Sequence, residues 1–230
     1  MQRYSEEKIM SEKNNSQQSA AVEACRILNH PILQHNLTRL RNKETSPVDF
    51  RRVMDQLSAL LAYEITRDIS MSVAPVDTPL EQTESPVVND DIVIVSIMRA
   101  GNGMLEGLLR MLPFSRVGHI GIYRDKFIGN TVEYYFRLPD EVKGRKILLA
   151  DPLIATGDTA VASIDRLKEY GVGSIRFVSL LASPEGLTHL YNHHPDVEVY
   201  TLSVERELTP DGYILPGLGD AGDRLYGTAV

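Results

Sequence analysis

Four short apolar runs constrain the fold of this chain more than any other feature of its sequence. None of them alternates with polar residues, which is typical of strands covered on both faces of a sheet. They span residues 91–97, 145–151, 174–182 and 196–204. Helix-like stretches lie between them, at 103–112 and at 158–171, and the second ends on a glycine, as helices often do. This alternation predicts an α/β fold with a mainly parallel sheet flanked by helices.

The strongest helix signal precedes the first of these strands. Ser46 suits an N-cap, Pro47 suits the first helical position, and the charge of Asp49 complements the positive end of a helix. Apolar residues then recur at helical spacing, namely Phe50, Val53, Met54, Leu57, Leu60, Leu61 and Ile65. We expect an N-terminal helical segment with this stripe in the core, and part of the stripe is also suited to another subunit.

The first part of the chain reads differently from the rest. Residues 1–23 are mostly polar and predict a flexible tail, with ordering by a partner chain as the alternative. Residues 24–230 are expected to form a single domain, since the hydrophobic fraction of 43% supplies a core of useful size.

Charge and cysteine content narrow the function classes. The net charge of −7 argues against a large nucleic-acid-binding face, which needs basic residues. Cys25 is the only cysteine, so no intrachain disulfide forms. No apolar run approaches the roughly 20 residues that span a bilayer, and the first residues lack a secretory apolar core. The expected location is the cytoplasm, with no membrane or nucleic-acid partner.

The tip of the second strand is the most informative place for chemistry. There Asp151 is followed by a short loop through Thr156 and Gly157 into a helix that begins with Asp158 and Thr159. Unpaired amides and partial positive charge at a helix N-terminus suit a phosphate, and the two threonines add hydroxyl donors. Asp151 is placed to accept bonds from hydroxyls beside that phosphate, as on a ribose. The same residues also suit a plain helix cap, and spacing alone leaves both interpretations open.

Glycines crowd the other end of the chain. Five of the sixteen glycines fall in the stretch GYILPGLGDAGDRLYGT, at positions 212, 217, 219, 222 and 227. Apolar residues are interleaved with them, which favours a packed loop over a loose one. Glycines let a backbone bend tightly and approach a ligand closely. Such a backbone offers N–H and C=O groups of fixed direction to a flat, hydrogen-bonding ring.

At these two segments the sequence resembles a known family. ILLADPLIATGDTA resembles the phosphoribosyl-diphosphate loop of type I phosphoribosyltransferases, and its Asp-Pro start, with the C-terminal stretch, is similar to the uracil-specific branch of that family. IMRAGNGMLEGLL, GIYRD and HPILQHNLTRLRNKETS add to the likeness, which covers about residues 24–230.

The resemblance implies that uracil and 5-phosphoribosyl 1-diphosphate give UMP and diphosphate, with Mg²⁺ bound mainly through the donor's diphosphate and no protein metal ligands assigned. The donor would be bound by Arg99, Arg124, Asp151, Pro152, Leu153, Ile154, Ala155, Thr156, Gly157, Asp158, Thr159 and Asp220. Uracil would be bound by Ile214, Gly219, Asp220 and Ala221, and Asp220 is the one predicted catalytic residue.

The same resemblance implies a homodimer or homotetramer, activation by GTP and inhibition by CTP or UTP, without a place for an effector site. Two alternatives remain: a nucleotide-responsive regulator that binds RNA on the same fold, and a relative that binds ligand without turnover. The net charge and the uracil-type C-terminal motif favour the enzyme.

Two positions depart from the family pattern. Asp158 stands where glycine is common, and a carboxylate beside a phosphate should repel it unless the side chain points away or caps the helix. The segment 125–135 resembles a mobile hairpin over the site but lacks the usual threonine and proline pattern.

Overall fold

A mostly parallel sheet forms the centre of the computed structural model, which describes residues 16–124 and 131–228. In these residues seven strands follow in the order β1 (Arg26–Ile27), β11 (Glu198–Thr201), β9 (Ile175–Val178), β7 (Lys146–Ala150), β4 (Ile92–Met98), β5 (Arg116–Arg124) and β6 (Thr131–Arg137). Only β6 runs antiparallel to its neighbour. The predicted buried strands at 91–97 and 145–151 are confirmed as β4 and β7.

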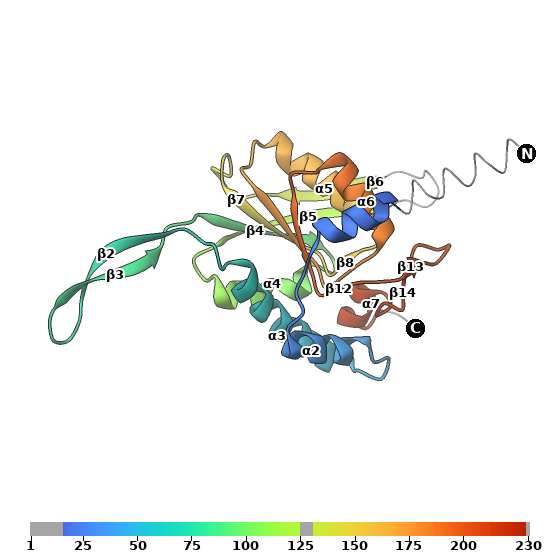
Figure 1. Ribbon diagram of the computed structural model, residues 1–230, viewed down its shortest axis with the longest axis horizontal. Coiled ribbons are helices and arrows are strands. Elements are labelled where there is room, and N and C mark those ends of the chain that lie inside the picture. The colour runs from blue at the N-terminus through green and yellow to red at the C-terminus, as the bar shows by residue number, and fades with distance from the viewer. Residues whose placement is uncertain (1–15, 125–130, 229–230) are drawn as a thin grey trace, which may run out of the picture.

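Helices cover both faces of this sheet (Figure 1). One face carries α2 (Pro31–Arg41), α3 (Pro47–Ile65) and α4 (Asn102–Met111), and the other carries α5 (Asp158–Glu169) and α6 (Pro184–His193). The α/β prediction is therefore confirmed. Within the described ranges, no helix combines the length and the apolar character needed to cross a membrane.

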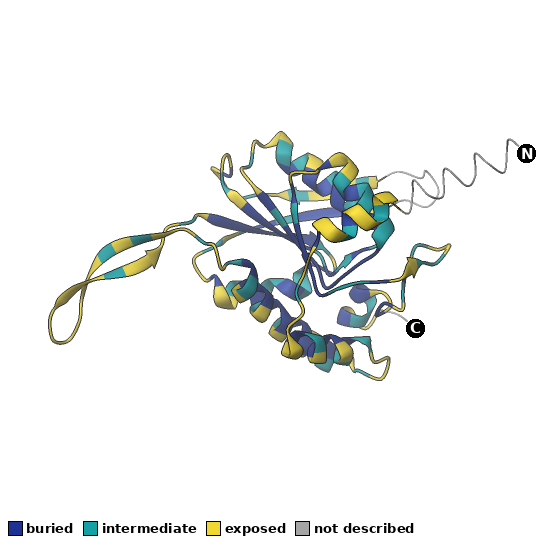
Figure 2. Ribbon diagram, viewed as in Figure 1, coloured by how far each residue is buried: buried dark blue, intermediate teal, exposed yellow. Residues whose placement is uncertain are grey.

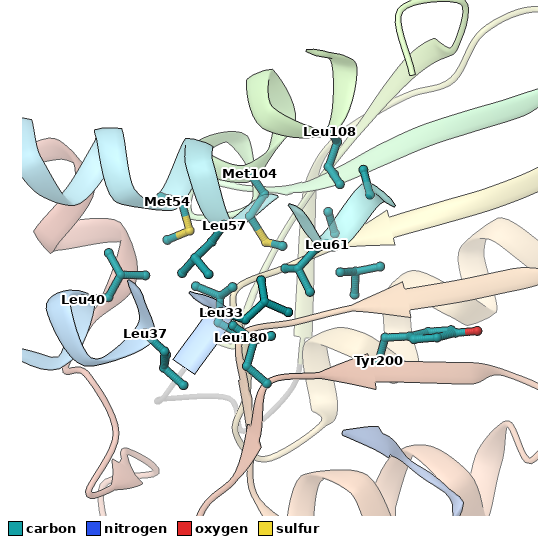
Figure 3. Close-up of a cluster of buried hydrophobic side chains, with 14 of the residues drawn as sticks. Leu33, Leu37, Leu40, Met54, Leu57, Leu61, Met104, Leu108, Leu180 and Tyr200 are labelled. Atoms are coloured by element: carbon teal, nitrogen blue, oxygen red, sulfur yellow. The ribbon is translucent and has the colours of Figure 1, made fainter. Parts of the chain in front are cut away.

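The helix α3 forms as its sequence predicts. The hydroxyl of Ser46 accepts a hydrogen bond from the Asp49 amide at 3.1 Å, a cap that contributes about 1 kcal/mol, and Pro47 begins the helix. The predicted stripe is buried except for Leu60, which is 38% exposed. Figure 3 shows Met54, Leu57 and Leu61 of this stripe packed among side chains of α2 and α4.

The other two predicted runs each divide between two sheets. Residues 174–182 form β9 and then β10 (Leu181–Ala182), and residues 196–204 form β11 and then β12 (Ser203–Val204). The second strand of each pair lies with β8 (Leu153–Ile154) in a small parallel sheet. This sheet extends past the carboxyl ends of the main strands and carries the loop after Asp151.

The boundary that we predicted between residues 23 and 24 does not coincide with the end of a secondary-structure element. Residues 16–24 are helical, so that boundary falls inside a helix. Ala21 and Cys25 are buried in the core on the α5 and α6 side, and this small apolar face holds an otherwise polar segment against the domain. The single-domain assignment of residues 24–230 remains a prediction.

A long hairpin of β2 (Met71–Asp77) and β3 (Gln82–Val88) projects from the domain (Figure 1). Most of its residues are exposed (Figure 2), including apolar ones such as Val73 at 66%. This arm was not predicted from the sequence.

Candidate active site

The predicted phosphate loop lies between β8 and α5, at the carboxyl edge of the sheet. Gly157 has a φ of 86°, in the left-handed region, and a Cβ there would lie 2.7 Å from the carbonyl oxygen of Gly186. Only glycine fits both constraints. The Ser183 hydroxyl donates to the carbonyl of Ala155 at 2.5 Å and holds the loop against the start of α6. The first amides of α5 are thus presented from a fixed loop.

The side chain of Asp158 is directed toward two neighbours. Its carboxylate accepts a hydrogen bond from the Thr156 hydroxyl at 2.9 Å and lies 3.4 Å from Nε2 of His189 on α6. The N-cap of α5 is Gly157, which makes no side-chain cap, so Asp158 does not act as the N-cap residue. In this arrangement Asp158 engages a hydroxyl that was predicted to bind phosphate.

Asp151 leaves the end of β7 and is half-buried. Burial raises the pKa of its carboxyl to about 7, a hydrogen bond from the Leu153 amide opposes this increase, and the charge of Asp220 adds to it. Asp220, predicted to share the donor site with Asp151 from a distant part of the sequence, is therefore near enough for its charge to act on the Asp151 carboxyl.

Arg99 follows β4 through a cis peptide bond with Met98. Its Nη2 donates to Oδ1 of Asp223 at 3.2 Å, and Nη1 lies 3.5 Å from the Thr228 hydroxyl. The partner of Asp223 is therefore Arg99, whereas the adjacent Arg224 donates to main-chain carbonyls. The hydrogen bond from Thr228, and then Arg99, hold the pKa of Asp223 below its usual value.

Arg124 is the last residue of β5, and its side chain lies outside the described part of the structure. Of the predicted hairpin at 125–135, residues 125–130 also lie outside it, and residues 131–135 belong to β6.

The C-terminal segment is packed. It comprises β14 (Ile214–Leu215), which pairs with β13 (Glu207–Leu208), a cis Leu215–Pro216 bond, and α7 (Ala221–Tyr226). Asp220 caps α7 by accepting from the Asp223 amide at 2.9 Å. Ile214 and Ala221 are buried in the core, so only their main-chain groups remain for a base, whereas Gly219 and Asp220 are exposed.

Close approaches join these segments into one region. A Cβ on Gly212 would meet the Thr156 methyl at 3.6 Å, and a Cβ on Gly103 would meet the Leu225 side chain at 2.6 Å. The Tyr226 hydroxyl donates to the carbonyl of Arg99 at 3.1 Å. The C-terminal segment therefore closes over both the phosphate loop and the start of α4.

A separate cavity lies at the opposite edge of the sheet, where β4 and β7 begin. Its lining includes two ion pairs, Arg176 with Asp68 and Lys146 with Asp90, and none of the predicted site residues.

A model of the family described as uracil phosphoribosyltransferase matches residues 27–228, from the first strand to the end of the C-terminal segment. The chain belongs to the uracil phosphoribosyltransferase family. It is 49% identical over 206 residues to the uracil phosphoribosyltransferase of Legionella pneumophila, covering 89% of this chain and 96% of that protein. It is 50% identical over 203 residues to that of Brucella anthropi, covering 88% and 98%.

A solved structure has a similar fold over most of the chain. The AQ2163 protein of Aquifex aeolicus superposes with a TM-score of 0.85 at 35% identity, over 89% of this chain and 98% of that one. The predicted type I phosphoribosyltransferase fold is confirmed.

In this member of the uracil phosphoribosyltransferase family, sequence reasoning missed the residues that hold the C-terminal segment. Arg224 donates to the carbonyls of Leu40, Leu218 and Asn42 and stacks 4.4 Å from the centre of the Phe50 ring. A second group, Arg41 with Glu205, contacts Gly217. The position of Glu205 just after a predicted strand indicated that it lies near the site, but its partner Arg41 is distant in sequence.

Proposed function

We propose that this protein is a uracil phosphoribosyltransferase that converts uracil and 5-phosphoribosyl 1-diphosphate into UMP and diphosphate, a step of pyrimidine salvage. Its membership in the family that carries this name supports the activity. The structural observation that carries it is the C-terminal segment folded against the phosphate loop, with Gly212 next to the Thr156 methyl.

The chemistry is a displacement at the anomeric carbon of the ribose. N1 of uracil forms a bond to C1′, the bond from C1′ to diphosphate breaks with its electron pair leaving on the diphosphate, and the N1 proton is released. Positive charge develops on the sugar, so the protein's contribution is positioning and electrostatic stabilisation.

The donor would bind across two strand tips. The amides at the start of α5 and the hydroxyls of Thr156 and Thr159 would hold the 5′-phosphate, and Asp151 would accept from the ribose hydroxyls. Arg99 and Arg124 would bind the diphosphate, since the planar guanidinium matches phosphate oxygens. The side chain of Arg99 is 55% exposed and needs only to exchange one carboxylate partner for another anion.

The base would bind the main chain around Gly219 and Asp220. Main-chain donors and acceptors of fixed direction match the two N–H and two C=O groups of uracil. They would reject cytosine, whose pattern is reversed at one edge, because a wrong base leaves polar groups unpaired.

Mg²⁺ is the cofactor that we propose, bound mainly through the donor's diphosphate. The carboxylates of Asp151 and Asp220 are the oxygen ligands that suit this cation, and the charge of Asp220 acts on Asp151. The ion would offset the charge that develops on the leaving diphosphate.

We extend the proposal to a homodimer or homotetramer in the cytoplasm that GTP activates and CTP or UTP inhibits. The projecting β2–β3 arm, with exposed Met71, Val73, Val87 and Val88, supports assembly. Light scattering after gel filtration tests the assembly, and initial rates with and without each nucleotide test the regulation.

The activity is tested by incubating the protein with Mg²⁺, uracil and the donor and measuring UMP. We expect UMP with uracil and none with cytosine. Absence of UMP under every magnesium and nucleotide condition would contradict the proposal. A nucleotide-responsive regulator gains no support from the relatives named above, which are called uracil phosphoribosyltransferases.

A further inference from the structure

A buried carboxylate lies beneath the C-terminal segment. The side chain of Glu205 is 2% exposed and accepts two hydrogen bonds from Arg41, at 2.7 and 2.6 Å. It also accepts from the Ser203 hydroxyl at 2.6 Å and from the Gly217 amide at 3.0 Å. Burial alone would raise the pKa of Glu205, but Arg41, Ser203 and the Gly217 amide outweigh it and hold the pKa below its usual value. The carboxylate is therefore kept ionised with its lone pairs occupied.

Arg41 and Glu205 together bind the main chain of Gly217. Besides Glu205, its Nη1 donates to the Gly217 carbonyl at 3.0 Å. Both polar main-chain groups of Gly217 are thus bound by this one ion pair. Gly217 has a φ of 61°, and a Cβ there would run into the carbonyl of Ile214, so no other residue allows this conformation.

Leu218, the next residue, is bound by a second arginine, Arg224. Arg224 donates to the Leu218 carbonyl at 2.9 Å and to the carbonyls of Leu40 and Asn42, at the end of α2. Arg41 is the last residue of the same helix. Residues 217–218 are therefore tied to the end of α2 by two arginines, directly before the exposed Gly219 and Asp220.

We propose that Arg41 and Glu205 are positioning residues for the pyrimidine subsite. They fix the direction of the Gly217 peptide groups and thereby aim the main chain of residues 219–221 at the base. This inference rests on the proposed function and adds to it a determinant of uracil affinity and of the choice between uracil and cytosine. Neither residue needs to touch the substrate.

An ion pair suits this role because it fixes the orientation of the groups that it binds. A bidentate arginine–carboxylate pair has a defined plane, unlike an apolar contact. A main-chain template for a base depends on such fixed direction, because a displacement of about 1 Å costs on the order of 100-fold in rate. The burial of Glu205 excludes water that would compete for the Gly217 amide.

The test compares Arg41→Lys and Glu205→Gln with Arg39→Lys, a control on the same helix whose guanidinium bonds to Asn36 rather than to the C-terminal segment. Arg41→Lys keeps the charge but loses the fork, and Glu205→Gln keeps the shape but loses the charge. Because each variant changes a different partner of the ion pair, the test remains valid if one of the two does not fold. KM for uracil, KM for the donor, and the ratio of kcat/KM for uracil to that for cytosine are measured, with Tm for each variant.

We expect KM for uracil to rise about 10-fold to 100-fold, KM for the donor to change less than about twofold, and the preference for uracil over cytosine to fall, while Arg39→Lys resembles the wild type. Equal changes in both KM values, or an unchanged KM for uracil in a folded variant, would overturn the positioning role. These outcomes differ from failure of the proposed function, in which the wild-type protein itself makes no UMP.

Discussion

Asp220, at the start of α7, lies near enough to Asp151, at the end of β7, for its charge to act on the Asp151 carboxyl. Burial raises the pKa of Asp151 to about 7, and the charge of Asp220 adds to this increase. Burial disfavours the charged form of a carboxyl group, and groups with strongly shifted pKa values concentrate at functional sites. This relationship supports our proposal that the phosphate loop and the C-terminal segment act on one substrate.

Replacing Asp220 with asparagine should lower kcat by about 100-fold, the usual scale for losing one preorganised electrostatic group. Asparagine caps helices as well as aspartate does, so the bond to the Asp223 amide and the fold should persist. Steady-state UMP formation and circular dichroism check both parts, with the exposed Asp211→Asn as control. Wild-type kinetics in Asp220→Asn would contradict the role assigned to Asp220.

The raised pKa of Asp151 predicts how stability depends on pH. Between the unfolded value of 3.8 and about 7, the folded state binds more protons than the unfolded state, so this group's contribution to stability is lost as pH rises through about 7. Asp151→Asn does not ionise. Its Tm should therefore exceed that of the wild type by a few degrees at pH 8, and the gap should close toward pH 4. A Tm difference that is constant across this range would be the contrary result.

The carboxylate of Asp158 engages Thr156 beside the predicted phosphate site. Asp158→Gly and Asp158→Asn should each lower KM for the phosphoribosyl donor, by about tenfold, equivalent to about 1.4 kcal/mol, because a negative charge near the phosphate is removed. KM for uracil should stay constant. A rise of the donor KM in both variants would mean that the carboxylate helps to bind the donor.

Arg99 pairs with Asp223 at 3.2 Å and is proposed to bind diphosphate. Arg99→Ala should raise KM for the donor about 10-fold to 100-fold, since charge-assisted hydrogen bonds contribute about 1.5–3 kcal/mol each. Arg110→Ala is the matched control, because Arg110 is an exposed arginine paired with Asp55 away from the site. Equal donor KM values in the two variants would exclude the role of Arg99.

The structural features that are determined by a few neighbouring residues could be predicted from the sequence. The buried runs at 91–97 and 145–151, the capped start of α3 and the left-handed Gly171 after α5 are each encoded within a few residues. The position of Asp151 at the carboxyl end of a strand could be predicted because it directly follows a buried apolar run.

Contacts between segments that are distant in sequence could not be predicted from it. Arg41 is far from Glu205 in sequence and Arg99 is far from Asp223, so no local pattern predicts either pair. The burial of Ala221 depends on how α7 packs against α3. The helix of residues 16–24 was missed because composition, rather than its narrow apolar face, decided the prediction.

The most direct test of the central claim is a crystal structure of the protein with UMP. We expect the phosphate at the amides of residues 156–159 and the uracil ring against the main chain between Ile214 and Ala221, with Asp220 beside the sugar. UMP bound at another edge of the sheet, or a C-terminal segment turned away from the base, would contradict it.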